Sequence, residues 1–97
     1  MGASGQIVID FGAAPGSDRA TVALIGQAAI LAGSLCEAWI DATHAATADH
    51  TQDEHSMAAA GIGITCQTIV AGTGFTIVAA SAVGMVIGKW NLNWVWN

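Results

Sequence analysis

Charged residues are scarce in this sequence, and bases are the scarcest of them. Only 9% of the residues are charged, whereas an ordinary soluble domain has about 25%. Arg19 and Lys89 are the only bases against seven acids, so the net charge is −5. Affinity for nucleic acid or anionic lipid needs several Lys or Arg side chains that neutralise phosphate groups. We therefore expect neither a nucleic-acid partner nor electrostatic attachment to a membrane.

Cysteine is nearly absent, and no targeting signal is evident. Cys36 and Cys66 lie in unrelated surroundings without the spacing of a zinc or redox motif. We expect two small buried apolar side chains, and a disulfide between them stays open because spacing alone does not fix its geometry. The first residues lack the basic and apolar regions of a signal peptide, and Gln6 breaks the myristoylation pattern. These features predict synthesis in the cytoplasm.

The chain is also short, which limits the core that it can build. A chain of 97 residues has room for one domain, and such a domain buries only roughly 60 to 65% of its unfolded surface. Small domains often gain stability by oligomerisation. Four Trp, two Phe and three Met with few charges suit a chain that other proteins cover. The composition therefore predicts a protein that assembles.

Two long uncharged stretches, residues 20–36 and 56–88, raise the alternative of a membrane hairpin made of two helices. Six glycines interrupt the second stretch, and its apolar residues come in short β-branched groups such as Thr76 to Val78. Flanking Lys or Arg residues, which orient membrane helices, are nearly missing. We favour strands and keep the membrane hairpin as an outside alternative.

Alternation of apolar and polar residues predicts strands along most of the chain. The clearest case is the C-terminus, where Trp90, Leu92, Trp94 and Trp96 fall on one face of a strand. Turn residues at 12–18 and 71–74 separate other strands. The expected strands cover 6–11, 19–25, 34–42, 62–69, 75–80 and 90–97.

The predicted fold class is therefore all-β. We expect a small β-sandwich or jelly-roll-like domain of about six to eight short antiparallel strands. It spans residues 1–97 as a single domain, with a long polar loop at about 43–56.

The polar loop carries the residues most capable of chemistry. Imidazole and carboxylate side chains there are ligand types that suit zinc, iron or nickel; the candidates are His44, Asp49, His50, Asp53 and His55. Their spacing matches no common metal motif, so we favour a solvated loop whose side chains bind local backbone. We expect no cofactor and keep the metal site as an alternative.

The tryptophans are the other notable side chains. A row of indole rings can stack on sugars, but such residues are more often core or interface anchors. We expect Trp39, Trp90, Trp94 and Trp96 to serve as core and interface residues. The terminal position of Trp96 suggests an edge strand that another subunit could cover.

Enzyme activity is not expected. Ser34 or Ser56 could be combined with His50 and Asp49, but no nucleophile elbow is present. The short chain leaves little room for a substrate cleft, and Gly72 to Gly74 lacks the lysine of a phosphate loop. No catalytic residue is assigned.

Several blocks of sequence, taken together in their order, resemble small proteins encoded by tailed bacteriophages and by prophages of proteobacteria. The blocks are 5–16 (GQIVIDFGAAPG), 25–27, 37–40 (EAWI), 46–55 (ATADHTQDEH), 69–77 (IVAGTGFTI), 88–90 and 94–97 (WVWN). The resemblance spans nearly the whole chain and implies a virion component without catalytic residues. Relatives have a longer, more polar stretch where this chain has residues 81–87, so no function located there is transferred.

These observations lead to one expected role. We expect a capsid decoration or cement protein on the phage head, a homotrimer that contacts the major capsid protein or other virion proteins. The alternative is a tail-tip, fibre or head–tail connector subunit, in which receptor binding could use the Trp face or the His loop. In either case the expected location is the virion.

Overall fold

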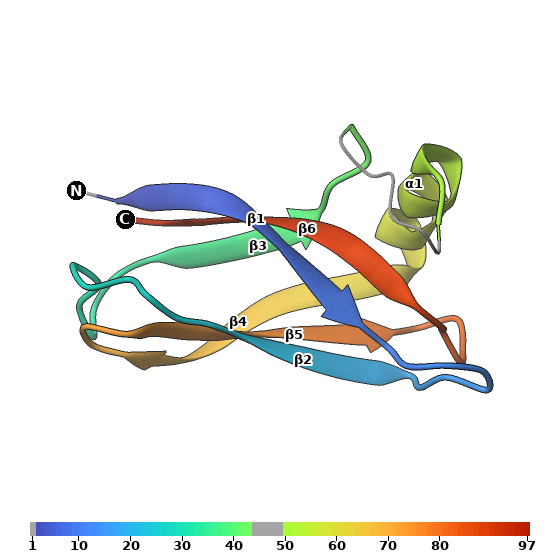
Figure 1. The fold of residues 1–97 in the computed structure, drawn as a ribbon, viewed down its shortest axis with the longest axis horizontal. Helices are drawn as coiled ribbons and strands as arrows, with labels where there is room; N and C mark the ends of the chain where they lie inside the picture. Colours follow the sequence, from blue (N-terminus) through green and yellow to red (C-terminus); the bar gives the residue numbers. More distant parts are fainter. Residues whose placement is uncertain (1, 44–49) are drawn as a thin grey trace.

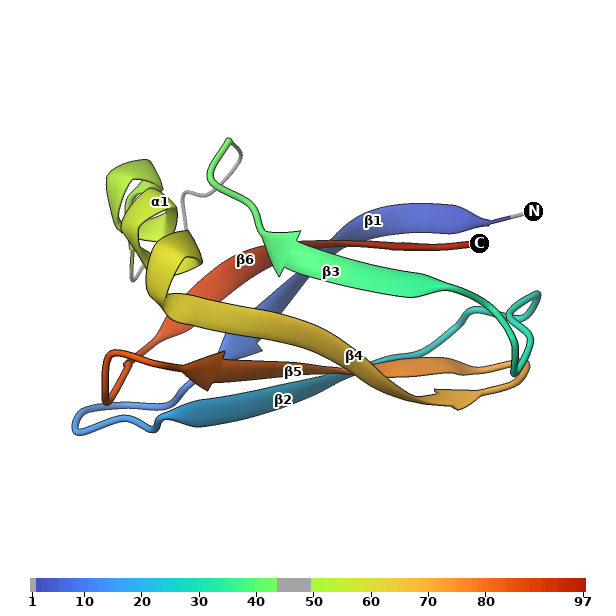
Figure 2. The ribbon, with the colours of Figure 1, turned by 180° about the vertical axis from the view of Figure 1, so that it is seen from behind.

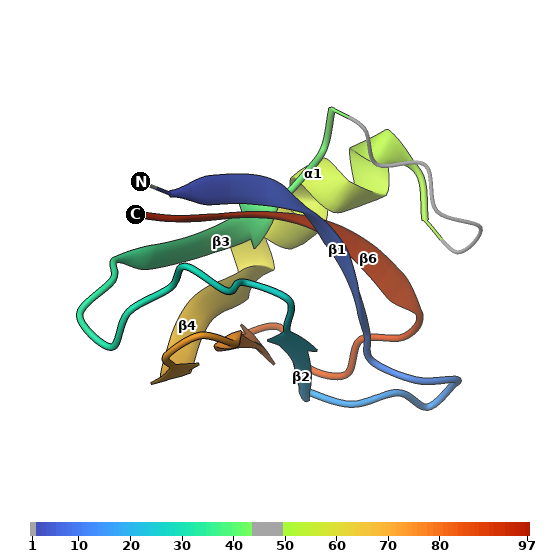
Figure 3. The ribbon, with the colours of Figure 1, turned by 60° about the vertical axis from the view of Figure 1, so that its left-hand side comes forward.

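The protein is a sandwich of two antiparallel sheets, each with three strands. The structure is a computed structural model, and it describes residues 2–43 and 50–97. One sheet has the strand order β1-β6-β3 and the other β2-β5-β4. Figure 1 shows the two layers, with the short helix α1 beside the end of β3, and Figure 3 shows the space between the layers. The all-β prediction is confirmed.

The strands lie close to where the alternation of apolar residues predicts them. Their bounds are β1 Ala3–Asp10, β2 Arg19–Leu24, β3 Cys36–Ile40, β4 Ile62–Val70, β5 Gly74–Ser81 and β6 Lys89–Trp96, with α1 at Gln52–Gly61. The turn expected at 71–74 joins β4 to β5, where the N–H of Thr73 donates to the carbonyl of Val70.

Side chains from both sheets fill the space between the layers. In β6 the four alternating residues Trp90, Leu92, Trp94 and Trp96 are all buried. Ile9 and Phe11 from the first strand region, and Phe75 and Ile77 from β5, pack in the same cluster. Because successive residues of a strand point to opposite faces of the sheet, the residues next to each core-facing side chain face outward.

The C-terminal strand is not an edge strand, contrary to our expectation. β6 lies between β1 and β3 and pairs with both of them. Ala3 is opposite Trp96 on one side, and Cys36 is opposite Trp96 on the other. The edges of the two sheets are instead β1, β3, β2 and β4. Sequence position says nothing about lateral order, because strand pairing is a non-local contact.

The expected polar loop at 43–56 is wrong in its second half, which begins the helix α1 (Figure 2). Thr51 caps this helix: its side chain accepts from the N–H of Glu54, whose carboxylate accepts from the N–H of Thr51. Such a reciprocal capping box satisfies two backbone donors that a helix start would leave unpaired. Ala58 to Ala60 then continue the helix as strong helix formers.

The two uncharged stretches form mainly strands and loops. Residues 20–36 contain most of β2 and the connection to β3, and residues 62–81 form the β4–β5 hairpin. The pair of long helices in the membrane-hairpin alternative is therefore not what these residues form. Within the described residues, no helix is long and apolar enough to cross a membrane.

Candidate functional site

Two histidines and one tryptophan form a cluster where α1 meets β6. The imidazole of His50 stacks on the indole of Trp90, with ring centroids 3.6 Å apart and an interplanar angle of 15°. His55 meets the same indole edge-on at 4.9 Å. His55 is fully buried, and His50 and Trp90 are nearly so. We call His50, His55 and Trp90 the histidine cluster.

His50 and Trp90 share one acceptor. The Nε2 atom of His50 lies 2.7 Å from the carbonyl oxygen of Ile87, and the indole Nε1 of Trp90 donates to the same oxygen at 3.1 Å. A carbonyl oxygen only accepts, so Nε2 of His50 carries a proton. The Ile87 carbonyl is thereby held against the cluster, which fixes the connection between β5 and β6.

The other nitrogen of His50 faces Glu54. Its Nδ1 atom lies 3.3 Å from a carboxylate oxygen of Glu54, one turn along α1. When the imidazole is charged, both of its nitrogens donate, and this contact becomes an ion pair. The backbone N–H of Thr51, followed by the His50 side chain, holds the pKa of the Glu54 carboxyl below its ordinary value. Glu54 therefore contributes a negative charge at the surface beside the cluster.

His55 joins the helix to the central strand. Its Nε2 accepts a hydrogen bond of 3.0 Å from the backbone N–H of Asn91, and its Nδ1 lies 2.7 Å from the carbonyl of Thr51. Because the N–H of Asn91 can only donate, Nε2 has no proton and Nδ1 has one. His55 is thus a neutral imidazole with both nitrogens satisfied inside the fold.

The structure places three of the five candidate metal ligands, His50, Asp53 and His55. His50 and His55 are buried with both nitrogens engaged, and Asp53 is exposed on α1. His44 and Asp49 lie outside the described residues. Residues 2–43 and 50–97 contain no group of three or more His, Cys, Asp or Glu side chains that could hold a metal ion. The solvated-loop expectation is wrong for His50 and His55, because both pack on Trp90.

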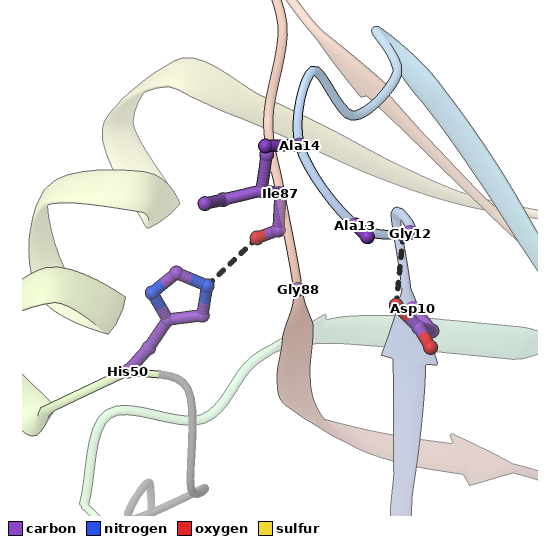
Figure 4. A pocket seen from close by; sticks show the side chains of 7 residues that line it. All are labelled: Asp10, Gly12, Ala13, Ala14, His50, Ile87 and Gly88. Atoms are coloured by element: carbon purple, nitrogen blue, oxygen red, sulfur yellow. Dashed lines mark hydrogen bonds between the residues drawn. The ribbon is translucent and has the colours of Figure 1, made fainter.

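A hollow of about 470 Å³ lies next to the cluster. It is lined by Asp10, Gly12, Ala13, Ala14, His50, Ile87 and Gly88. Figure 4 shows His50 reaching the Ile87 carbonyl from one side of the 87–88 backbone, with Asp10 on the other side accepting from the N–H of Gly12. Among the described residues, the hollow thus offers no acid and base aimed at one point, as general acid–base catalysis needs.

The larger feature is an apolar groove on the helix side of the cluster. It has a volume of about 570 Å³, and we call it the α1 groove. Its wall on the helix includes Met57, Ala60 and Gly61, and its opposite wall is the β5–β6 connection with Val83, Met85 and Ile87. Met57 is 77% exposed and Val83 76% exposed. Glu54 lies at its polar end. The α1 groove is thus lined by exposed apolar side chains from two separate parts of the chain.

Three of the four tryptophans predicted to serve as core and interface residues lie in the core of the chain. Trp90, Trp94 and Trp96 are buried in the core, so they leave little surface for another subunit. The indole of Trp96 donates to the side chain of Gln27 at 2.9 Å. The buried Nε1 of Trp94 has no hydrogen-bond partner among the described residues. Trp39 differs, because 45% of its surface is exposed.

Trp39 lies beside a shallow hollow on the outer face of the β1-β6-β3 sheet. The hollow has a volume of about 350 Å³ and is lined by Ser4, Gly5, Gln6, Trp39, Asn93, Trp94 and Val95. Pairing across the sheet places Gln6, Asn93 and Trp39 in one row over the three strands. The exposed indole is therefore accompanied by two amide side chains.

Both cysteines are free thiols that pack against the core, but they are partly buried and not buried as expected. Burial raises the pKa of the Cys36 thiol. Burial also raises the pKa of the Cys66 thiol to about 11, and the neighbouring Cys36 and Glu37 add to the effect. Both thiols are therefore poor nucleophiles at neutral pH, because the thiolate is the reactive form.

The α1 groove was not predicted from the sequence. Its helix was hidden in an apparently polar loop, although the Thr51–Glu54 capping-box pattern is visible in the sequence. The opposite wall, residues 82–88, contains no charged residue and no polar side chain. A run of apolar residues that is not part of a predicted strand could have indicated an exposed apolar surface at this place.

Comparison with known proteins adds no relative: no protein-family model, no curated protein and no solved structure matches this chain. The function is therefore inferred from the residues and their geometry.

Proposed function

We propose that this chain is a structural subunit of a tailed-bacteriophage particle, a decoration or cement protein on the outside of the head. The observation that carries the proposal is the α1 groove, whose apolar side chains lie exposed on a chain with few charges. Met57, Val83 and Met85 each have well over half of their surface exposed. Large exposed apolar areas on small proteins mark interaction sites. The resemblance of the sequence to small phage proteins supports the phage particle as the location of the chain.

A second apolar area supports assembly with copies of the same chain. It lies at the end of the sandwich away from α1, in the connection from β2 to β3 and at the turn after β4 (Figure 1). The large apolar residues exposed there are Ile25, Leu31, Leu35 and Val70. A decoration protein needs one surface for its own copies and another for the capsid. We assign the α1 groove to the capsid and the Leu35 end to a homotrimer.

The proposed mechanism has no chemical step. Apolar area removed from water contributes about 25 cal/mol per Å², although part of this gain is offset by the entropy lost on association. The net charge of −5 gives the chain no electrostatic attraction to DNA, which suits a position on the outside of the head. The protein would thereby add adhesion between neighbouring capsid subunits.

A second candidate, a tail-tip, fibre or connector subunit, is favoured by one observation. Trp39 is exposed on the outer face of the β1-β6-β3 sheet, within β3 and between the two apolar ends. A receptor-binding subunit needs such a face turned toward the host.

Quantitative mass spectrometry of purified particles separates the candidates. A decoration protein repeats at each symmetry-related position of the head, so we expect roughly hundreds of copies per particle. A tail or connector protein would be present in about three, six or twelve copies, set by its ring symmetry. Absence of the chain from washed particles would overturn both.

Charge substitutions in the two apolar ends test the assignment of surfaces. We expect Met85→Asp to abolish binding to particles while the oligomer remains. We expect Leu35→Asp to weaken the oligomer, as measured by sedimentation. Thr21→Asp, at an exposed position of β2, is the matched control and should change neither. Particle binding that survives Met85→Asp would contradict the role of the α1 groove.

A further inference from the structure

The outer face of the β1-β6-β3 sheet is a different kind of surface from the α1 groove. Core-facing residues alternate along its strands with outward-facing ones, among which amides are prominent. Gln6, Asn91 and Asn93 alternate in their strands with core-facing residues such as Ile7, Leu92 and Trp94. No Lys or Arg lines its hollow of about 350 Å³.

Trp39 provides an aromatic surface on this face. Its neighbours in the strand, Ala38 and Ile40, are buried, so strand alternation turns the indole outward. The indole makes no hydrogen bond with another residue of the described chain, and it is 45% exposed. A large aromatic side chain held on a rigid strand offers a preformed flat contact at low entropic cost.

One of the polar groups beside the indole is held in place by neighbouring hydrogen bonds. The amide nitrogen of Gln6 donates to Oδ2 of Asp41 at 2.7 Å. Asp41 is itself 2% exposed, and its Oδ1 accepts from the backbone N–H and the hydroxyl of Thr43 at 2.9 and 2.8 Å. The Gln6 side chain is therefore oriented by a second layer of hydrogen bonds. Side chains fixed in this way are typical of binding sites.

The exposed indole and the amide side chains beside it together favour one chemical class of ligand. A flat apolar contact next to amide donors and acceptors suits a molecule with one apolar face and several hydroxyl groups. Glu37 on β3 and the buried Asp41 give the surroundings an acidic character, which disfavours phosphate and sulfate groups. The volume of the hollow is at the lower end of the range of about 300 to 1,000 Å³ for ligand sites, so a short segment fits better than a large one.

We propose that this face binds a neutral carbohydrate. Trp39 stacks on the apolar face of a pyranose ring, and Asn93 and Gln6 hydrogen-bond to its hydroxyl groups. The site stands apart from the α1 groove and does not depend on the position of the chain in a particle. The ligand class follows from the aromatic ring, the two amides and the absence of basic side chains in the hollow.

Titration of the isotope-labelled full chain with neutral oligosaccharides tests the proposal. The probes are cellotetraose, maltotetraose, chitotetraose and mannotetraose, each at millimolar concentration, with heparin fragments as the anionic comparison. We expect at least one neutral probe to shift the indole N–H of Trp39 and the side-chain amides of Asn93 and Gln6. Heparin fragments should leave these signals unchanged. The Trp39 indole signal is assigned by its loss in Trp39→Phe.

Variants make the test specific to this face. We expect Trp39→Ala to weaken binding at least tenfold and Asn93→Ala several-fold. Val8→Ala, on the same face but outside the hollow, is the matched control and should bind as the parent does. The proposal is overturned if no neutral probe shifts these signals, or if the shifts persist in Trp39→Ala. Self-association that Trp39→Ala abolishes would also overturn it, because a second copy would then occupy the face.

Discussion

The Nε2 atom of His55 accepts a hydrogen bond from the backbone N–H of Asn91, at a distance of 3.0 Å, inside the core. This contact ties the only helix of the described chain to the middle strand of a sheet. It also fixes the tautomer of His55, since Nδ1 donates to the carbonyl of Thr51. The helix wall of the α1 groove therefore depends on one buried imidazole.

Replacing His55 should destabilise the protein strongly. His55→Ala leaves a cavity and removes the imidazole acceptor of the Asn91 N–H, so we expect a loss of about 2 to 4 kcal/mol in the free energy of unfolding. His55→Gln retains an oxygen that can accept and should cost less. Urea denaturation measures both. Long-range 1H–15N spectra should show Nδ1 protonated and Nε2 bare, and the opposite tautomer would contradict the assigned hydrogen bonds.

The capping box at the start of α1 should contribute measurably to stability. Thr51→Ala removes the side-chain acceptor for the N–H of Glu54, at a cost of about 1 kcal/mol. Thr51→Ser keeps the hydroxyl and should lie close to the parent in urea denaturation. Equal destabilisation by both variants would show that the methyl group of Thr51, and not its hydroxyl, carries the effect.

Ionisation of Cys66 should make the protein less stable at high pH. Burial raises the pKa of this thiol from 9.0 to about 11, so the unfolded chain loses its proton first. Stability should be unaffected below about pH 9 and should fall as the pH rises toward 11. Urea denaturation across this range measures the fall. Cys66→Ala should remove most of it, and an undiminished fall in that variant would contradict the role of this thiol.

The same thiol should also react slowly. In a Cys36→Ala background, iodoacetamide at pH 8 should modify Cys66 much more slowly in the folded protein than in urea, because little thiolate is present. Equal rates in both states would contradict the raised pKa.

Two glycines of the β1–β2 turn allow the energetic cost of backbone strain to be compared with the cost of a steric clash. Gly12 and Gly16 both have positive φ, at +91° and +79°. A Cβ at Gly12 would meet open space, whereas a Cβ at Gly16 would collide with the carbonyl oxygen of Val86. We expect Gly12→Ala to cost about 1 kcal/mol from strain alone. Gly16→Ala should cost clearly more in thermal denaturation, and equal costs would refute the close approach.

The two C-terminal indoles should respond differently to loss of their N–H. Trp96→Phe leaves the Gln27 oxygen without its donor, whereas Trp94→Phe removes a buried N–H without a partner among the described residues. Since both changes remove similar volume, we expect Trp96→Phe to be about 1 kcal/mol more destabilising. Urea denaturation of the two variants gives the difference, and the reverse order would contradict these roles.

Local patterns predicted much of the fold. The alternation from Trp90 to Trp96 correctly identified both the strand and its buried face, because side-chain direction in a strand depends only on position. The capping box of α1 was equally local, yet the polar composition around it concealed a helix of ten residues. Short helices are stabilised mainly by packing, and here the packing partner is Trp90, far along the chain.

The candidate sites were less predictable, because they depend on long-range pairing. His50 and His55 lie among polar residues in the sequence, and contact with Trp90 of β6 buries them. Trp39 and Asn93 become neighbours through the pairing of β3 with β6. The alternation from Trp90 to Trp96 indicates a buried face, whereas the short strand around Trp39 carries no such row of large apolar residues, so the outward direction of Trp39 was not predicted. The α1 groove likewise needs α1 and the β5–β6 connection together.

The central place of β6 has a consequence for the order of folding. β1 and β3 do not pair with each other but only with β6, which follows both of them in the chain. Their sheet therefore lacks its central strand until β6 is synthesised. Closing the contact between Ala3 and Trp96 brings together residues from nearly opposite ends of the chain. Such long-range closure is slow compared with a hairpin such as β4–β5. During translation, the inner faces of β1 and β3 would therefore remain exposed longest, and they are the surfaces most in need of protection from aggregation.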